Sequence, residues 1–137
     1  MTFEEALFDY LSTNTGIVAV VDDRIYPKRL VQDPTLPAIV FQVVSARPAY
    51  TNDQAGDPPG ASTSYVRNRV QFDLWADSYE GLLPVKSALF DGISGFRGMM
   101  GTMMIQSVFI LNELDGFEPD TGSNRNIIDA MFSFEGQ

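Results

Sequence analysis

The side chains in this sequence that could do chemistry are mainly carboxylates, because the chain contains no histidine and no cysteine. Without these residue types it lacks the commonest general base, a thiolate nucleophile and thiolate ligands for zinc. The adjacent acids Glu4/Glu5 and Asp22/Asp23 are candidates for acid and base, but neighbouring carboxylates point in different directions. Glu4 and Glu5 are better explained as first-turn residues that interact with a helix dipole. No Gly-x-Ser-x-Gly or Ser-x-x-Lys signature of acyl chemistry is present, so we expect no catalytic residues.

Three glycines, Gly92, Gly95 and Gly98, have a spacing loosely similar to that of a phosphate-binding loop. They follow a predicted helix rather than a strand, and no Lys-Ser or Lys-Thr pair comes after them. A flexible helix-to-strand connection is the better interpretation, since glycine accepts the backbone angles of tight turns. We therefore expect no cofactor at this segment.

A group of acidic residues near the C-terminus has oxygen donors at a spacing that could hold a divalent cation. The group consists of Asp115, Glu118 and Asp120 beside Gly122 and Asn124. It lacks the alternating ligands and the Glu at the twelfth position that define an EF-hand loop. Turn formation and solvation are the better explanation, and we expect no metal here.

The chain is acidic, with 9 Lys plus Arg, 18 Asp plus Glu and a net charge of −9. This balance argues against binding to a phosphate backbone by counterion release. Arg67, Arg69 and Trp75 are expected on one strand face and could pair with nucleotides, but a wetter face or a subunit contact is the better interpretation. The acidic start and the lack of an apolar run of about 18 residues predict no leader and no membrane span. We expect the protein in the cytoplasm or in a particle assembled there.

Hydrophobic periodicity and capping signals predict two helices. Thr2 and Glu5 have the spacing of a capping box, followed by an apolar stripe that ends near residues 14–16. Ser78 can cap the second helix, although Pro84 should kink its first turn or delay its start. The short apolar run 17–21 follows the first helix.

Strands are expected at residues 38–45, 66–76, 102–114 and 127–134, with a brief extended segment at 24–26 and turns at 115–116 and 120–122. The first strand is apolar on both alternating faces, which predicts cover on both sides and a central place in its sheet. From residue 66, strict alternation predicts one buried and one wetter face. The order is typical of an α+β domain with two helices packed on a mainly antiparallel sheet of about four strands.

Residues 47–64 break the periodicity with prolines, glycines and small polar residues, which predicts a long exposed arm within a single domain spanning residues 1–137. The arm is far longer than the usual hairpin loop of about 2–5 residues, and such length is usually functional or disordered. Aromatic residues are enriched at interface cores, so Tyr50 and Tyr65 are candidate contacts with a neighbouring subunit. The full candidate interface consists of Arg47, Tyr50, Tyr65, Arg67, Arg69 and Trp75.

Five short segments carry a family resemblance that spans nearly the whole chain. They are residues 23–27 (DRIYP), 36–41 (LPAIVF), 70–76 (VQFDLWA), 96–98 (FRG) and 117–122 (FEPDTG). In this order and spacing they resemble the tail completion or tail terminator family of tailed phages. The opening helix and the closing alternation at residues 127–134 also fit the layout of that family.

This resemblance implies a small α+β subunit of the virion that forms a hexameric ring on the tail tube protein, stops tube growth and offers a surface to the head-closure or connector protein of the neck. It implies no catalytic residues, and DNA would pass through the ring without specific binding. Two alternatives stay open. One is another neck or tail component, such as a head-closure protein or a tube subunit. The other is a small-ligand-binding module that uses residues 92–101 or the arm as a lid.

Overall fold

The computed structural model describes residues 2–32, 34–50, 64–119 and 122–135, which form three helices and a sheet of six strands. Along the chain the elements are α1 (Phe3–Thr13), α2 (Thr15–Val21), β1 (Ile25–Pro27), β2 (Ala38–Tyr50), β3 (Ser64–Ala76), α3 (Tyr79–Ile93), β4 (Gly98–Met100), β5 (Met103–Glu118) and β6 (Ser123–Glu135). The predicted α+β class is confirmed. None of the described helices is long and apolar enough to cross a membrane.

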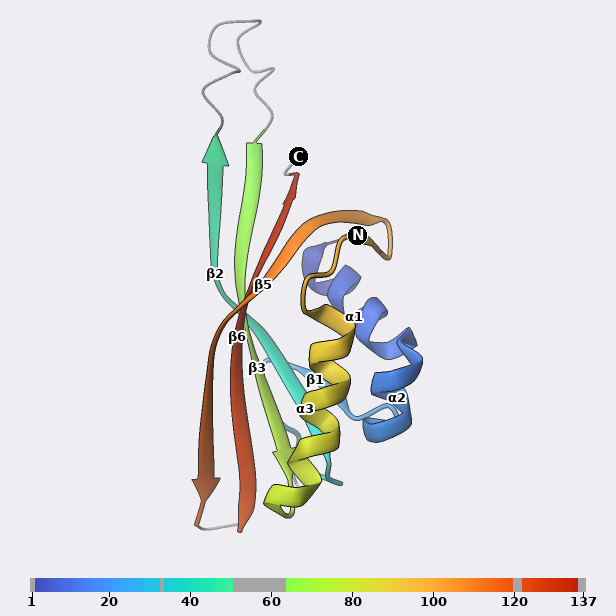
Figure 1. Cartoon of the computed structure of the whole chain (residues 1–137), viewed down its shortest axis with the longest axis vertical. Coiled ribbons are helices and arrows are strands. Elements are labelled where there is room, and N and C mark those ends of the chain that lie inside the picture. The colour runs from blue at the N-terminus through green and yellow to red at the C-terminus, as the bar shows by residue number, and fades with distance from the viewer. Residues whose placement is uncertain (1, 33, 51–63, 120–121, 136–137) are drawn as a thin grey trace, which may run out of the picture.

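The sheet has the strand order β1-β2-β3-β6-β5-β4 (Figure 1). The four long strands pair antiparallel, including the predicted hairpin of β2 with β3. The expectation of about four antiparallel strands needs correction, because β1 and β4 add a short strand at each edge and β1 runs parallel to β2. Between Pro27 and Ala38 the chain returns along the sheet, so β1 and β2 start from the same end of the sheet.

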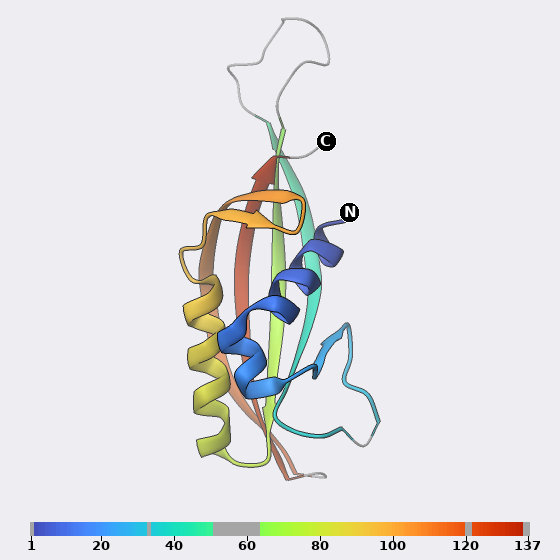
Figure 2. The same cartoon turned by 90° about the vertical axis from the view of Figure 1, so that its right-hand side faces the viewer.

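All three helices lie on one face of the sheet, which leaves the other face without a helical layer (Figures 1 and 2). The capping box predicted for α1 is confirmed: the Thr2 hydroxyl accepts a hydrogen bond from the Glu5 amide at 3.2 Å, and the Thr2 amide donates to the Glu5 carboxylate at 3.5 Å. The helix ends at Thr13, within one residue of the predicted end.

A third helix, α2, is missing from the sequence prediction. Its apolar residues 17–21 are mostly β-branched and favour a strand on propensity alone. The helix forms because the Asn14 side chain caps it, accepting from the Ile17 amide at 3.1 Å, and because Ile17 and Val21 are buried in the core. Packing and a cap therefore override local propensity.

The helix α3 begins directly after its predicted cap, with the Ser78 hydroxyl accepting from the Gly81 amide at 3.0 Å. The predicted delay is wrong, since Pro84 lies inside the helix. Pro84 is exposed, and the helix still buries its predicted stripe of Leu82, Val85, Leu89 and Ile93. Burial of these four side chains outweighs the loss of one amide donor.

The core lies between the helical layer and one face of the sheet. Phe132 is fully buried, with ring centroids 5.4 Å from Phe3 and 6.2 Å from Phe72. The other sheet face also buries Ala38 and Val40, so the predicted two-sided cover of this strand holds for residues 38–41. Residues 42–46 of β2 are half-buried or exposed, and from Gln42 onward the strand lies at the edge of the sheet, which corrects its expected central place.

The hairpin strands are longer than predicted. β2 continues through Arg47 to Tyr50, and β3 starts at Ser64, so both ends of the predicted arm belong to the sheet. Residues 51–63, the rest of the arm, lie outside the described residues. The turn predicted at 115–116 is wrong, because β5 runs through it to Glu118 in a continuous ladder with β6. Backbone pairing over this length outweighs the turn preference of an Asp-Gly pair.

Candidate interaction surface

The face of the sheet without helices carries the polar side of β3, as the alternation predicted. Asn68, Val70, Phe72, Leu74 and Ala76 point into the core and are buried. The residues between them, from Arg67 to Trp75, are exposed or half-buried. The side chains of β3 that are accessible to a partner therefore lie on this helix-free face.

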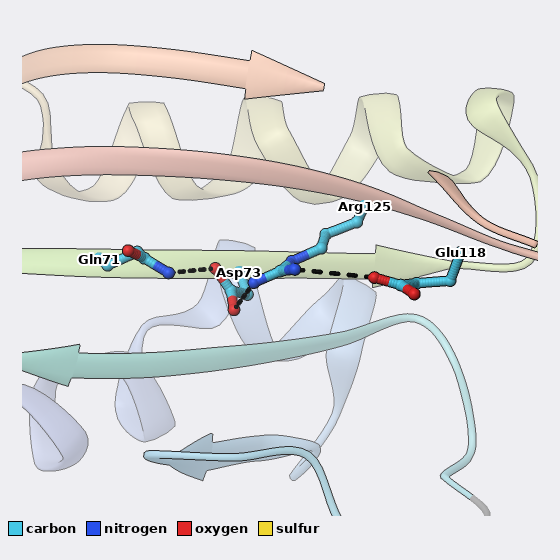
Figure 3. Close-up of polar contacts among 4 residues, drawn as sticks. All are labelled: Gln71, Asp73, Glu118 and Arg125. Carbon is cyan, nitrogen blue, oxygen red and sulfur yellow. Dashed lines mark hydrogen bonds and ion pairs between the residues drawn. The ribbon is translucent and has the colours of Figure 1, made fainter. Parts of the chain in front are cut away.

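Two arginines, Arg125 and Arg69, form the ion pairs on this face. Arg125 donates through Nη2 to Asp73 Oδ2 at 2.6 Å and lies 3.8 Å from Glu118 Oε1, and Gln71 donates to the other oxygen of Asp73 at 3.1 Å (Figure 3). The same guanidinium lies over the ring of Trp75, 5.1 Å from its centroid. Because the Asp73 side chain is only 15% exposed, the pair is better shielded than an ordinary surface salt bridge.

The second pair joins Arg69 to Asp129, with 2.6 Å between Nη2 and Oδ2. Asp129 is buried at 8% exposure, while the Arg69 side chain is 46% exposed. Arg69 and Trp75, both predicted as interface residues, thus already have partners within the chain. Their outer surfaces stay accessible, and their contact with another subunit stays a prediction.

The remaining predicted interface residues lie along the β2–β3 ladder. Arg67 is exposed and is the register partner of Arg47. The backbone of Tyr50 pairs with Ser64, and that of Tyr65 with Ala49 and Glu135. The fold therefore brings Arg47, Arg67 and Arg69 to one end of the same hairpin. Their role in contacts between subunits stays a prediction.

A group of exposed apolar side chains on β5 was not predicted from the sequence. We call the group the β5 stripe, and it consists of Phe109 (62% exposed), Leu111 (50%), Leu114 (56%) and Phe117 (59%). The predicted strand was correct, but periodicity cannot distinguish an apolar face covered by a helix from one left open. Among the described residues, β4 pairs only with Met103 to Ile105, so the rest of β5 is an open sheet edge. An exposed apolar patch of this kind usually marks an interaction site.

The acidic residues considered for a cation do not gather into a site in the described part of the chain. The Asp115 carboxylate accepts a hydrogen bond from the side-chain amide of Asn126 at 2.7 Å, and the Glu118 carboxylate lies 3.8 Å from the Arg125 guanidinium. Asp120 lies outside the described residues. Within residues 2–32, 34–50, 64–119 and 122–135, no cluster of three or more acidic side chains could hold a metal.

The glycine segment serves the backbone and the helix packing. Gly95 has a φ of +67° in the turn after α3, a conformation that favours glycine. A Cβ on Gly92 would lie 3.2 Å from Ile17 Cδ1, because α2 packs closely on α3 at this point. These observations agree with a tight helix-to-strand connection as the interpretation of this spacing.

An α+β chain with an open, apolar strand edge is typical of a subunit that associates through its sheet. A family model described as tail completion protein gp17 matches residues 5–132, and the chain belongs to this family. Membership places it in the tail of a phage or phage-derived particle. The fold is also similar to that of a chain in the virion of a native gene transfer agent particle, with a TM-score of 0.66, 13% sequence identity and coverage of 98% of this chain and 95% of that chain. Among curated proteins, no sequence matches the chain.

Proposed function

We propose that this protein is a tail terminator, a structural and non-catalytic subunit that forms a hexameric ring, caps the tail tube and joins the tail to the neck. The β5 stripe is the observation that carries the proposal. In a chain of 137 residues, four large apolar side chains stand exposed along one open strand edge. Open edges are templates for pairing with another chain, and a closed ring gives every copy such a partner.

The charge of the chain supports a ring through which DNA passes. With a net charge of −9, the subunit has no overall attraction for the phosphate backbone that would hold DNA in the channel. The proposed partners are a further copy of the chain, the tail tube protein and the head-closure or connector protein. DNA is a passing cargo with no specific site.

The first test is the association state of the purified chain, measured by mass photometry and sedimentation with and without tail tubes. We expect monomer and hexamer, and rings at the ends of tubes in electron micrographs. Long tubes grown from this chain alone would instead identify a tube subunit. A strictly monomeric chain in the presence of tubes, with thermal stabilisation by a nucleotide, would support a ligand-binding module and overturn the ring.

The second test is made in the particle. Deletion of the gene should leave filled heads separate from tails of uncontrolled length, because nothing stops the tube or offers a surface to the neck. Complementation with the intact gene is the control. Joined particles with tails of normal length in the deletion would overturn the proposed function.

A further inference from the structure

The two edges of the sheet are open over different lengths. Among the described residues, β1 pairs only with Ile39 to Phe41, so β2 has no outer strand partner from Gln42 onward. At the opposite edge, β5 has none beyond Ile105. A contact between two unlike edges is head to tail, since each edge of one copy then meets the other edge of the next.

The strand directions suit such a contact. Three antiparallel pairings separate β2 from β5, so the two edge strands point in opposite directions. Rotation about an axis along the strands keeps their directions, so β5 of one copy faces β2 of the next in antiparallel orientation. This is the more stable of the two ladder types.

The same rotation also sets which residues face each other. Leu114 lies on one row of the sheet with Val40, through the register pairs Leu114–Ile127, Ile127–Asp73 and Asp73–Val40. The loop after β1 lies beside this row, because the Lys28 amide donates to the Phe41 carbonyl at 2.8 Å. Phe41 lies on the row of Glu113, through the pairs Phe41–Phe72, Phe72–Ile128 and Ile128–Glu113, so rotation without translation brings the start of this loop beside Glu113 and Leu114 of the next copy.

The two segments have complementary chemistry. The loop, residues 28–32 (KRLVQ), has exposed Lys28 and Arg29, which form no ion pair in the described part of the chain, and Val31 at 47% exposure. The facing end of β5, residues 114–118 (LDGFE), has exposed Leu114 and Phe117, exposed Asp115 and half-buried Glu118. A hollow of about 630 Å³, lined by residues 26, 27 and 29–32, lies beside the loop and has room for a phenyl ring. The loop thus offers cationic and apolar groups, and the end of β5 at the same level offers anionic and apolar groups.

We infer that residues 28–32 of one copy dock on residues 114–118 of the next copy, with Lys28 and Arg29 against Asp115 and Glu118 and with Phe117 in the hollow beside the loop. The inference rests on the proposed ring and names its subunit contact. The occupant is a second copy because both complementary surfaces belong to this chain, at opposite edges of one sheet.

Two variants test the contact from its two sides. The loop variant carries Lys28→Glu and Arg29→Glu, and the stripe variant carries Asp115→Lys and Phe117→Ser. Each should weaken self-association by about 100-fold or more, because like charges then face each other across the contact. A control variant carries Arg97→Glu and Asp91→Lys, exposed positions outside both segments, and should assemble like the wild type.

Mixing the two variants in equal amounts gives the sharper result. Each mutated surface blocks one contact, but the intact stripe of the loop variant still fits the intact loop of the stripe variant. Sedimentation velocity should therefore show monomers of each variant alone and dimers in the mixture, with larger species as well because the two charge-reversed surfaces attract each other. Circular dichroism and thermal unfolding first establish that both variants are folded. If either will not fold, the milder single changes Arg29→Gln and Phe117→Ser replace it.

The outcomes separate this inference from the proposed function. If the wild type forms hexamers and both folded variants do so equally well, the assigned contact is wrong and the ring stands. If the mixture of two folded monomeric variants gives no dimer, the head-to-tail pairing of these segments is overturned. If the wild type never associates, even on tail tubes, the ring itself fails.

Discussion

Replacement of Phe109 by alanine should leave the free subunit folded and weaken its assembly. The side chain lies on the helix-free side of β5, opposite Met131 in the ladder, and is 62% exposed. It contributes little to the core, so the thermal stability of the monomer should change by less than about 1 kcal/mol, the range of strand propensity. In the proposed ring, the next copy covers the phenyl group.

The magnitude follows from the exposed area. A phenylalanine offers about 150–250 Å², so an exposure of 62% leaves roughly 90–160 Å² for a partner. At about 25 cal/mol per Å², full coverage contributes about 2–4 kcal/mol per contact. Loss of most of this term weakens each contact on the order of 100-fold. Because the substitution is present at every contact of a closed ring, the protein concentration needed for assembly should rise strongly.

The assay is mass photometry over a dilution series, with thermal unfolding of the same samples. The matched control is Leu83→Ala on the helical layer, because Leu83 is 46% exposed and belongs to α3 rather than to the open edge of β5. The control should dissociate at the concentration of the wild type. Coincident dissociation curves for the wild type and a folded Phe109→Ala variant would refute the role of the stripe in assembly.

Three further predictions concern the fold. Phe132→Ala removes a fully buried ring and should lower the free energy of unfolding by about 3–5 kcal/mol in a denaturant titration, whereas a loss below about 1 kcal/mol would contradict the assigned core. Thr2→Ala breaks the capping box with Glu5 and should cost about 1 kcal/mol in the same titration, and Thr2→Ser should restore most of it. The hydrogen bond to Glu113 raises the pKa of Lys86 above its ordinary value of 10.5, against the opposing effect of burial. The linked stability is therefore fully present below pH 10.5 and is lost as pH rises through the higher pKa of the folded state, so a Lys86→Met variant should show a smaller alkaline loss of melting temperature than the wild type.

Much of the fold was predictable because local signals agree with tertiary packing. Alternation along residues 66–76 separates buried Val70 and Phe72 from the polar residues between them, and the structure has the same separation. The capping residues Thr2 and Ser78 mark the starts of α1 and α3. In these elements a single residue period determines both the local conformation and the buried face.

The missed elements depend on contacts between distant parts of the chain. The residues of α2 favour a strand locally, and only burial of Ile17 and Val21 with the Asn14 cap makes them helical. The Asp115-Gly116 pair has the composition of a turn, yet its backbone pairs with Asn126 and Arg125 of β6. Sequence periodicity does not contain this pairing, because the partner lies beyond the next turn.

The candidate site was predictable only in part for a similar reason. The sequence identifies Arg69 and Trp75 as exposed-face residues, but their partners Asp129 and Arg125 belong to β6, the neighbouring strand in space. It identifies β5 as an apolar strand, but the open edge follows from the strand order of the sheet. Apolar residues are therefore easy to find in sequence, while their exposure requires the topology.

The positions of the bulges limit which other chains can pair with this open edge. The ladder between β3 and β6 in the middle of the sheet is regular, with a single register from Tyr65 to Ala76. The two strands with open edges are irregular: β2 has a register shift at Val44, and β5 has shifts near Gln106 and Leu111. A bulge bends and twists an edge so that a flat strand of an arbitrary chain pairs poorly with it. A net charge of −9 adds a general repulsion between copies, which a contact must offset with complementary local charges. In the proposed ring, a second copy carries the complementary bent edge and pairs where other chains do not, so the selectivity of the proposed assembly lies in the shape and charge of the two edges.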